Sequence, residues 1–174
     1  MYRLGAKSLR ELDSGEFQVH PGLSLMVRTA ITITPVDFAV HDGIRTAEEQ
    51  QEYVRTGVSK TLLSYHLPDI PRNRGKDTEF GQAVDLVPYI NGKLRWEWDP
   101  IYKIANAMHS CLHLIDSTSR IRWGGVWDRT LDQLDPHNLE MERAQYASRC
   151  RARGKRAFSD GPHFQYEHKV FSLL

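Results

Sequence analysis

A run of apolar, β-prone residues at 83–90 is followed directly by Asn91-Gly92, and this segment constrains the fold more than any other part of the chain. Both central residues of a type I′ turn have positive φ, a conformation that Asn and Gly tolerate. The pair therefore predicts a β-hairpin in which residues 93–96 return beside the first strand. Because helical patterns lie on both sides of this hairpin, we expect an α+β fold with helices packed on one face of a small antiparallel sheet.

The other elements are indicated by start and stop signals. Thr46 and Glu49 have the spacing of a capping box, in which each side chain accepts the other residue's backbone N–H. Pro21 suits the first turn of a helix, and Asp99-Pro100 has the pattern of an N-cap followed by a helix-starting proline. Helices are predicted at 21–34, 46–57, 99–114 and 138–153, and further strands at 36–40, 120–123 and 164–166.

Length and composition indicate one domain spanning residues 1–174, which we expect to be a monomer. A net charge of +1 gives no support for nucleic-acid binding, since dedicated binders carry a clustered basic face. No stretch approaches the ~20 apolar residues of a membrane span, so no membrane anchor is expected. The charged segment 1–16 does not have the pattern of a signal peptide. Two polar segments, at 68–79 and 130–159, are expected to be insertions, the first of them a surface loop.

Two smaller features leave alternatives open. Basic residues gather between Arg149 and Arg156, where a solvated helix end and attraction to an acidic polymer such as a cell wall both fit. Cys111 and Cys150 are the only cysteines; Cys111 lies in an apolar helical pattern and is expected to be a small buried hydrophobe. The sequence leaves open whether the two pair.

The chemistry is concentrated in three short phrases that contain His66, Asp85 and His163. Two imidazoles and one carboxylate supply three protein ligands to zinc and leave the fourth tetrahedral position open, as in catalytic zinc sites. Asp160, three residues before His163, is placed to take a proton from a water molecule in that position. A rival pair, His109 and His113, has the helical spacing of a zinc motif but lacks the glutamate that serves as its general base.

These phrases carry a resemblance. The sequence resembles the zinc peptidases of the D-alanyl-D-alanine carboxypeptidase and dipeptidase class, and most closely the phage L-alanyl-D-glutamate endolysins. The matching phrases are Gly43-Ile44-Arg45-Thr46, Ser64-Tyr65-His66, Gly81-Gln82-Ala83-Val84-Asp85, Pro88-Tyr89-Ile90-Asn91-Gly92-Lys93, Arg122-Trp123-Gly124-Gly125-Val126-Trp127 and Asp160-Gly161-Pro162-His163. The sequence departs from the family at 68–79, which separates the first histidine from the aspartate.

The resemblance implies a Hedgehog/DD-peptidase-like fold and assigns roles to individual residues. It implies His66, Asp85 and His163 as zinc ligands, Asp160 as general base and Arg45 as the group that polarises the scissile carbonyl. Arg45 could instead pair with Glu48 or Glu49. Two further residues are expected near substrate: Ser64, which contacts substrate or orients the His66 backbone, and Trp123, which forms core and the wall of the substrate cleft.

The function implied is zinc-dependent hydrolysis of the L-alanyl-D-glutamate bond in the peptidoglycan stem peptide. The alternatives are a D-alanyl-D-alanine carboxypeptidase or dipeptidase, and a zinc-bearing wall-binding module without turnover. Such an enzyme is expected to accumulate in the host cytoplasm and to reach the wall after holin-mediated release.

Overall fold

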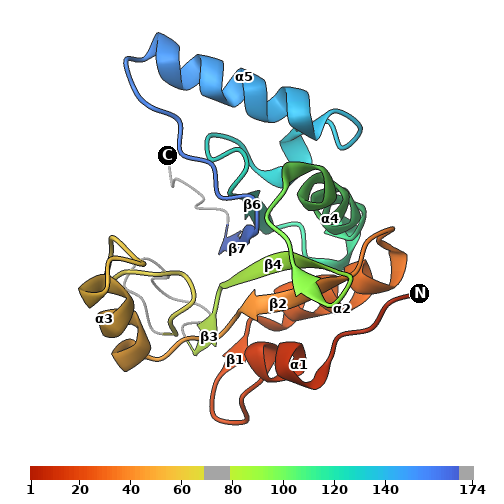
Figure 1. Cartoon of the computed structure of the whole chain (residues 1–174), viewed down its shortest axis with the longest axis vertical. Helices are drawn as coiled ribbons and strands as arrows, with labels where there is room; N and C mark the ends of the chain where they lie inside the picture. The colour runs from red at the N-terminus through yellow and green to blue at the C-terminus, as the bar shows by residue number, and fades with distance from the viewer. Residues whose placement is uncertain (69–78, 169–174) are drawn as a thin grey trace.

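The computed structural model describes residues 1–68 and 79–168. Its helices are α1 (Ala6–Leu12), α2 (Pro21–Ile33), α3 (Ala47–Arg55), α4 (Trp98–Ser110) and α5 (Leu139–Ala152), with 3₁₀ turns at Leu112–Leu114 and Leu131–Gln133. Its strands are β1 (Gln18–Val19), β2 (Phe38–Asp42), β3 (Phe80–Gly81), β4 (Ala83–Ile90), β5 (Lys93–Leu94), β6 (Ser119–Trp123) and β7 (His163–His168). Figure 1 shows β2, β4, β6 and β7 at the centre of the molecule, with α5 at the top of the view.

The central sheet has the strand order β2-β4-β7-β6, and every neighbouring pair in it is antiparallel. β5 pairs with β4 through the predicted hairpin, in which Asn91 and Gly92 have φ values of 54° and 74°. Positive φ at both positions is the signature of a type I′ turn, so the hairpin prediction is confirmed. The return strand is shorter than expected, because its pairing ends at Leu94.

The two faces of the sheet differ in character. Along β7, Phe164 and Tyr166 are buried in the core, and the alternating residues His163, Gln165 and Glu167 are on the opposite face. The buried face shares its core with side chains of α2 and α4, among them Met26 and Met108 from the two helices. The prediction of an α+β fold with a small antiparallel sheet is therefore confirmed, and the polar face is left for the site.

Local signals explain most of the helix boundaries. The capping box of α3 is present: Glu49 N–H donates to Thr46 Oγ1 at 3.2 Å, and Thr46 N–H donates to Glu49 Oε2 at 2.9 Å. α4 begins two residues earlier than predicted, with Glu97 rather than Asp99 at the N-cap. The Asp99 carboxylate instead contacts Lys103 one turn later, at 2.6 Å, which is the i,i+4 pairing that stabilises exposed helices.

Two elements near the N-terminus were not predicted. α1 packs against β2, and β1 pairs in parallel with β3, so that Val19 lies opposite Gly81. Both are too short to produce a clear hydrophobic period in the sequence. They bring the first 20 residues next to the strands that carry the site.

The two expected insertions have different outcomes. The one at 68–79 falls almost wholly on residues 69–78, which lie outside the described residues. The segment 130–159 is largely helical as expected, but it also contributes to the core through Leu131, Leu134, Leu139 and Tyr146. Removing it would therefore expose apolar surface.

Three further expectations concern single features. Cys111 is fully buried as predicted, and both cysteines are free thiols. The basic residues after Arg149 are exposed at the end of α5, and Arg149 itself pairs with Asp128. Among the residues described, no helix combines the length and apolarity needed to cross a membrane.

The core role of α5 can be tested with two residues on the same helix. Leu139 is 3% exposed and Met141 is 59% exposed. Leu139→Ala is expected to lower the free energy of unfolding by about 2–5 kcal/mol, because it leaves a cavity in the core. Met141→Ala should change it by about 0.5 kcal/mol or less. Chemical denaturation monitored by tryptophan fluorescence measures both, and equal small effects would show that α5 is not part of the core.

Candidate metal centre

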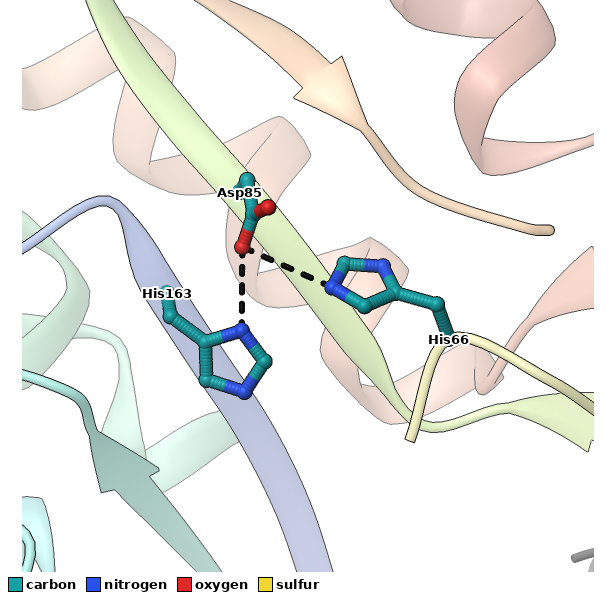
Figure 2. A group of neighbouring side chains, drawn as sticks. All are labelled: His66, Asp85 and His163. Atoms are coloured by element: carbon teal, nitrogen blue, oxygen red, sulfur yellow. Dashed lines mark hydrogen bonds and ion pairs between the residues drawn. The ribbon is translucent and has the colours of Figure 1, made fainter. Parts of the chain in front are cut away.

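The structure brings together the side chains of His66, Asp85 and His163, which come from three separate parts of the chain. Asp85 lies on β4, His163 lies on β7, and His66 follows α3 in a loop (Figure 2). One ligand atom from each residue lies within 4.8 Å of the other two. Asp85 and His163 are direct cross-strand partners in the β4–β7 ladder, so the sheet register itself sets their separation.

The imidazole ring of His66 is oriented by a backbone carbonyl group. Its ring is 3% exposed, and Nδ1 lies 2.7 Å from the carbonyl oxygen of Gly43. Since a carbonyl can only accept, Nδ1 carries the proton and the lone pair of Nε2 is free. Nε2 lies 3.5 Å from Asp85 Oδ1, so it is the nitrogen that faces the centre. This is the arrangement in which a backbone carbonyl orients a metal-binding histidine.

Gly81 permits the close approach that this arrangement requires. A Cβ atom at Gly81 would lie 2.8 Å from the carbonyl oxygen of His66 and 2.7 Å from the side chain of Ile44. Both distances are shorter than real Cβ atoms show, so a larger residue would displace the His66 backbone. The glycine in the second sequence phrase thus has a steric role.

His163 presents its other ring nitrogen. Nδ1 lies 3.0 Å from Asp85 Oδ1, and Nε2 lies 3.1 Å from Oε1 of Gln165. The indole of Trp127 packs against the imidazole at a centroid distance of 5.3 Å. The two histidines therefore face the centre through different atoms, His66 through Nε2 and His163 through Nδ1.

The charges at the centre are strongly coupled. Burial alone would raise the pKa of Asp85, but the two imidazoles outweigh it and hold the pKa well below its usual range. Burial would lower the pKa of His163, but the hydrogen bond and charge of Asp85 outweigh it and raise the pKa. An anionic carboxylate between two nitrogen donors is a donor set that zinc accepts, so these residues fit a zinc ion.

Asp160 is positioned beside this group by tight backbone contacts. Its N–H donates to the carbonyl of Gly124 at 2.8 Å, and its own carbonyl accepts the N–H of His163 at 3.2 Å. A Cβ at Gly124 would lie 2.2 Å from the Asp160 carbonyl oxygen, so the glycine is required for this approach. Burial, followed by the charge of Asp85, raises the pKa of the Asp160 carboxyl.

Arg45 and Ser64 both contact the loop that carries His66. The Arg45 side chain is buried, and its guanidinium contacts Asp42, Gln50 Oε1 at 2.6 Å and Ser64 Oγ at 3.4 Å. Ser64 Oγ also accepts the backbone N–H of His66 at 3.3 Å. These contacts support the loop that carries His66. Contact of either side chain with substrate stays a prediction.

Trp123 does not line a surface. Its side chain is fully buried, and its indole N–H donates to the carbonyl of Gly161 at 2.7 Å. The expectation that it contacts substrate is wrong for this structure, because alternation along β6 places it on the core side of the sheet. Its hydrogen bond to Gly161 instead supports the turn between Asp160 and His163.

Three polar residues near His163 were missed in the sequence: Gln165, Glu167 and Arg122. They join His163 through a continuous series of hydrogen bonds. A signal was present, because residues 163–168 alternate between polar and aromatic side chains, as a strand with one polar face does. The predicted strand at 164–166 was too short to show it.

The rival histidine pair does not form a comparable group. His113 Nδ1 lies 3.0 Å from the carbonyl of Ser110, within its own turn. Within residues 1–68 and 79–168, the cluster around Asp85 is the only group of three or more potential ligands that converge.

Comparisons with known proteins agree with this geometry. A family model described as phage L-alanyl-D-glutamate peptidase matches residues 1–166. The L-alanyl-D-glutamate peptidase of Escherichia phage T5 is 26% identical over 146 residues, which are 83% of this chain and 93% of that protein. The crystal structure of the Serratia marcescens L-Ala D-Glu endopeptidase ChiX matches with a TM-score of 0.60 at 30% identity, over 95% of this chain and 90% of that one. Because the family model covers nearly the whole chain, the protein belongs to the phage L-alanyl-D-glutamate peptidase family.

Proposed function

We propose that this protein is a zinc-dependent peptidoglycan endopeptidase that hydrolyses the L-alanyl-D-glutamate bond of the stem peptide. The observation that carries the proposal is the convergence of His66, Asp85 and His163 beside the carboxyl group of Asp160. Family membership supports the substrate, since both relatives described above are named for this bond. The phage relative also supports a role in host lysis.

The three converging side chains would hold the zinc ion. When bound, zinc supplies Lewis-acid chemistry, activating a water molecule and polarising a carbonyl group. His66 would bind it through Nε2 and His163 through Nδ1, since the other nitrogen of each ring already has a hydrogen-bond partner. Asp85 supplies the negative charge that the site needs for a divalent cation.

Asp160 would move the proton during hydrolysis. Its carboxylate would accept a proton from the attacking water and deliver it to the amine that leaves when the peptide bond breaks. A raised pKa suits this double role, because a more basic carboxylate accepts the proton of water more readily and, once protonated, can still donate it to the leaving amine. Arg45 is proposed to stabilise the developing oxyanion, which requires it to exchange part of its present contacts for substrate.

We further propose that the protein is one monomeric domain that accumulates in the host cytoplasm and reaches the wall through openings made by a holin. The similarity to a phage peptidase motivates this route. Co-expression with and without a holin, followed by measurement of lysis, tests it.

The first prediction of the proposed function concerns which bond of peptidoglycan is hydrolysed. Purified sacculi digested with the zinc-loaded protein should yield new N-terminal glutamate of the D configuration. Released D-alanine would instead identify a carboxypeptidase, and binding to sacculi without new termini would identify a wall-binding module. Labelling of new amino termini followed by mass spectrometry and chiral analysis separates the three outcomes.

The second prediction separates Asp160 from the ligands. Asp160→Asn should retain zinc at wild-type stoichiometry but lose about 10²–10⁴-fold in kcat, because the proton acceptor is gone. Asp132→Asn, which alters an exposed aspartate in an ion pair with Arg120, is the matched control and should leave kcat unchanged. Loss of zinc from Asp160→Asn would mean that this residue is a ligand rather than the base.

The third prediction concerns pH. The raised pKa of His163 means that the metal-free protein holds a proton at this ring to higher pH than an ordinary histidine does. Zinc must displace that proton, so its affinity should fall as pH decreases through the raised pKa, by about tenfold per pH unit for each proton released. Above that pKa the affinity should level off. Competition with a chromophoric chelator between pH 5.5 and 8.5 measures the slope, and a flat profile contradicts the assignment of His163 as a ligand.

A further inference from the structure

A series of hydrogen bonds runs along the polar face of the sheet and ends at His163. Arg122 on β6 donates to both carboxylate oxygens of Glu167, from Nε at 2.8 Å and from Nη2 at 2.9 Å. Gln165 Nε2 donates to Glu167 Oε1 at 2.5 Å, and Gln165 Oε1 lies 3.1 Å from His163 Nε2. His163, Gln165 and Glu167 alternate along β7, and Arg122 on β6 is the cross-strand partner of Gln165. The pleat therefore places all four side chains on one face of the sheet.

The direction of every bond in this series is determined by its far end. A guanidinium group can only donate, and an ionised carboxylate can only accept. Gln165 must therefore turn its NH₂ group to Glu167 and its carbonyl oxygen to His163. A carbonyl oxygen in turn requires a proton on Nε2 of the imidazole. Nδ1, on the other side of the ring, faces the ionised Asp85 carboxylate at 3.0 Å, so it also carries a proton until a metal ion displaces it.

We propose that Arg122, Glu167 and Gln165 form a positioning relay that keeps a proton on Nε2 of His163, so that Nδ1 is the nitrogen that exchanges its proton for the metal. The inference rests on the proposed zinc site, and it deepens it by naming the residues that prepare one ligand before the metal arrives. None of the three contacts the reacting atoms in this arrangement. They act through the imidazole alone.

A second contact of Arg122 supports the same role. Its Nη1 donates to the backbone carbonyl of Trp127 at 2.7 Å, and the Trp127 ring packs on the imidazole of His163. The Arg122 guanidinium thus restrains the His163 ring in two ways. It acts on Nε2 through Glu167 and Gln165, and on the face of the ring through the indole of Trp127. An ordinary surface ion pair would have neither connection.

The chain contains a matched ion pair for comparison. Arg149 also makes a two-pronged contact with a carboxylate, to Asp128 at 2.7 and 2.9 Å. The side chains of this pair are 25% and 22% exposed, against 23% and 21% for Arg122 and Glu167. Asp128 therefore provides a control with the same kind of interaction at the same burial and with no hydrogen-bonded route to the centre among the contacts described.

The decisive variant is Glu167→Gln, which is nearly isosteric and reverses the relay. The new amide accepts from Arg122 and donates its NH₂ to Gln165, so that Gln165 turns its own NH₂ to His163. Nε2 must then accept, so the ring keeps only the proton on Nδ1, the atom the metal needs. Gln165→Leu removes the contact without reversing it. Asp128→Asn is the control for Glu167→Gln.

Two measurements test the relay. Zinc affinity from chelator competition should fall about 10–100-fold in Glu167→Gln and Gln165→Leu, the usual effect of losing a residue that orients a ligand. It should stay at the wild-type value in Asp128→Asn, and the thermal unfolding midpoint of each variant shows that the fold is kept. Arg122→Lys, which retains a cationic donor to Glu167, should preserve more affinity than Arg122→Met.

The second measurement reads the proton directly. Long-range ¹H–¹⁵N spectra of the metal-free protein, recorded below the raised pKa of His163, should show protons on both Nδ1 and Nε2 in wild type and on Nδ1 alone in Glu167→Gln at the same pH. A proton that stays on Nε2 in Glu167→Gln, or zinc affinity equal to that of Asp128→Asn, overturns the proposal. If the wild-type protein binds no zinc, the proposed function fails, and the tautomer spectra still decide whether the relay exists.

Discussion

The antiparallel pairing of β4 with β7 is the constraint on which the rest of the site depends. It places Asp85 directly opposite His163, and the two-residue alternation of both strands then decides what lies on each face. Phe164 and Tyr166 are in the core, while the intervening polar residues share the open face with the ligands. A shift of one residue in this register would move His163 into the core and Phe164 to the site, so the apolar core also fixes the chemistry.

The local charges explain how one carboxylate and two imidazoles can lie close together at the centre. Asp85 remains ionised because two imidazoles surround it, and His163 gains proton affinity from the same contact. Asp42 would add a further negative charge only 3.9 Å from Nδ1 of His66, but the Arg45 guanidinium pairs with it. The negative charge of the centre is thus concentrated on Asp85, with Asp160 beside it.

Much of the fold, and the group formed by His66, Asp85 and His163, could be predicted because the signals are local. The Asn91-Gly92 turn and the capping box at Thr46 depend on residues within four positions of each other, and both are present in the structure. The start of α4 was misplaced by two residues, since Glu97 is the N-cap and Asp99 pairs with Lys103 instead of capping. The relay to His163 could not be found the same way, because Arg122 reaches Glu167 only through the register of β6 with β7, 45 positions apart in the sequence. Burial of Trp123 depends on that same register.

The contact between α1 and the Gly43 segment has a consequence for the smallest form of the enzyme. The Glu11 carbonyl accepts the N–H of Ile44 at 2.9 Å, and Gly43 approaches it so closely that a Cβ there would lie 2.0 Å from its oxygen. Gly43 in turn supplies the carbonyl that fixes the His66 ring. A shortened protein that begins after residue 13 would keep His66, Asp85, His163 and Asp160. It would lose the contact with Glu11 that supports the carbonyl oxygen of Gly43. The minimal catalytic unit is therefore set by the contacts that hold the Gly43 carbonyl in place, and it begins well ahead of His66, the first of the three converging residues.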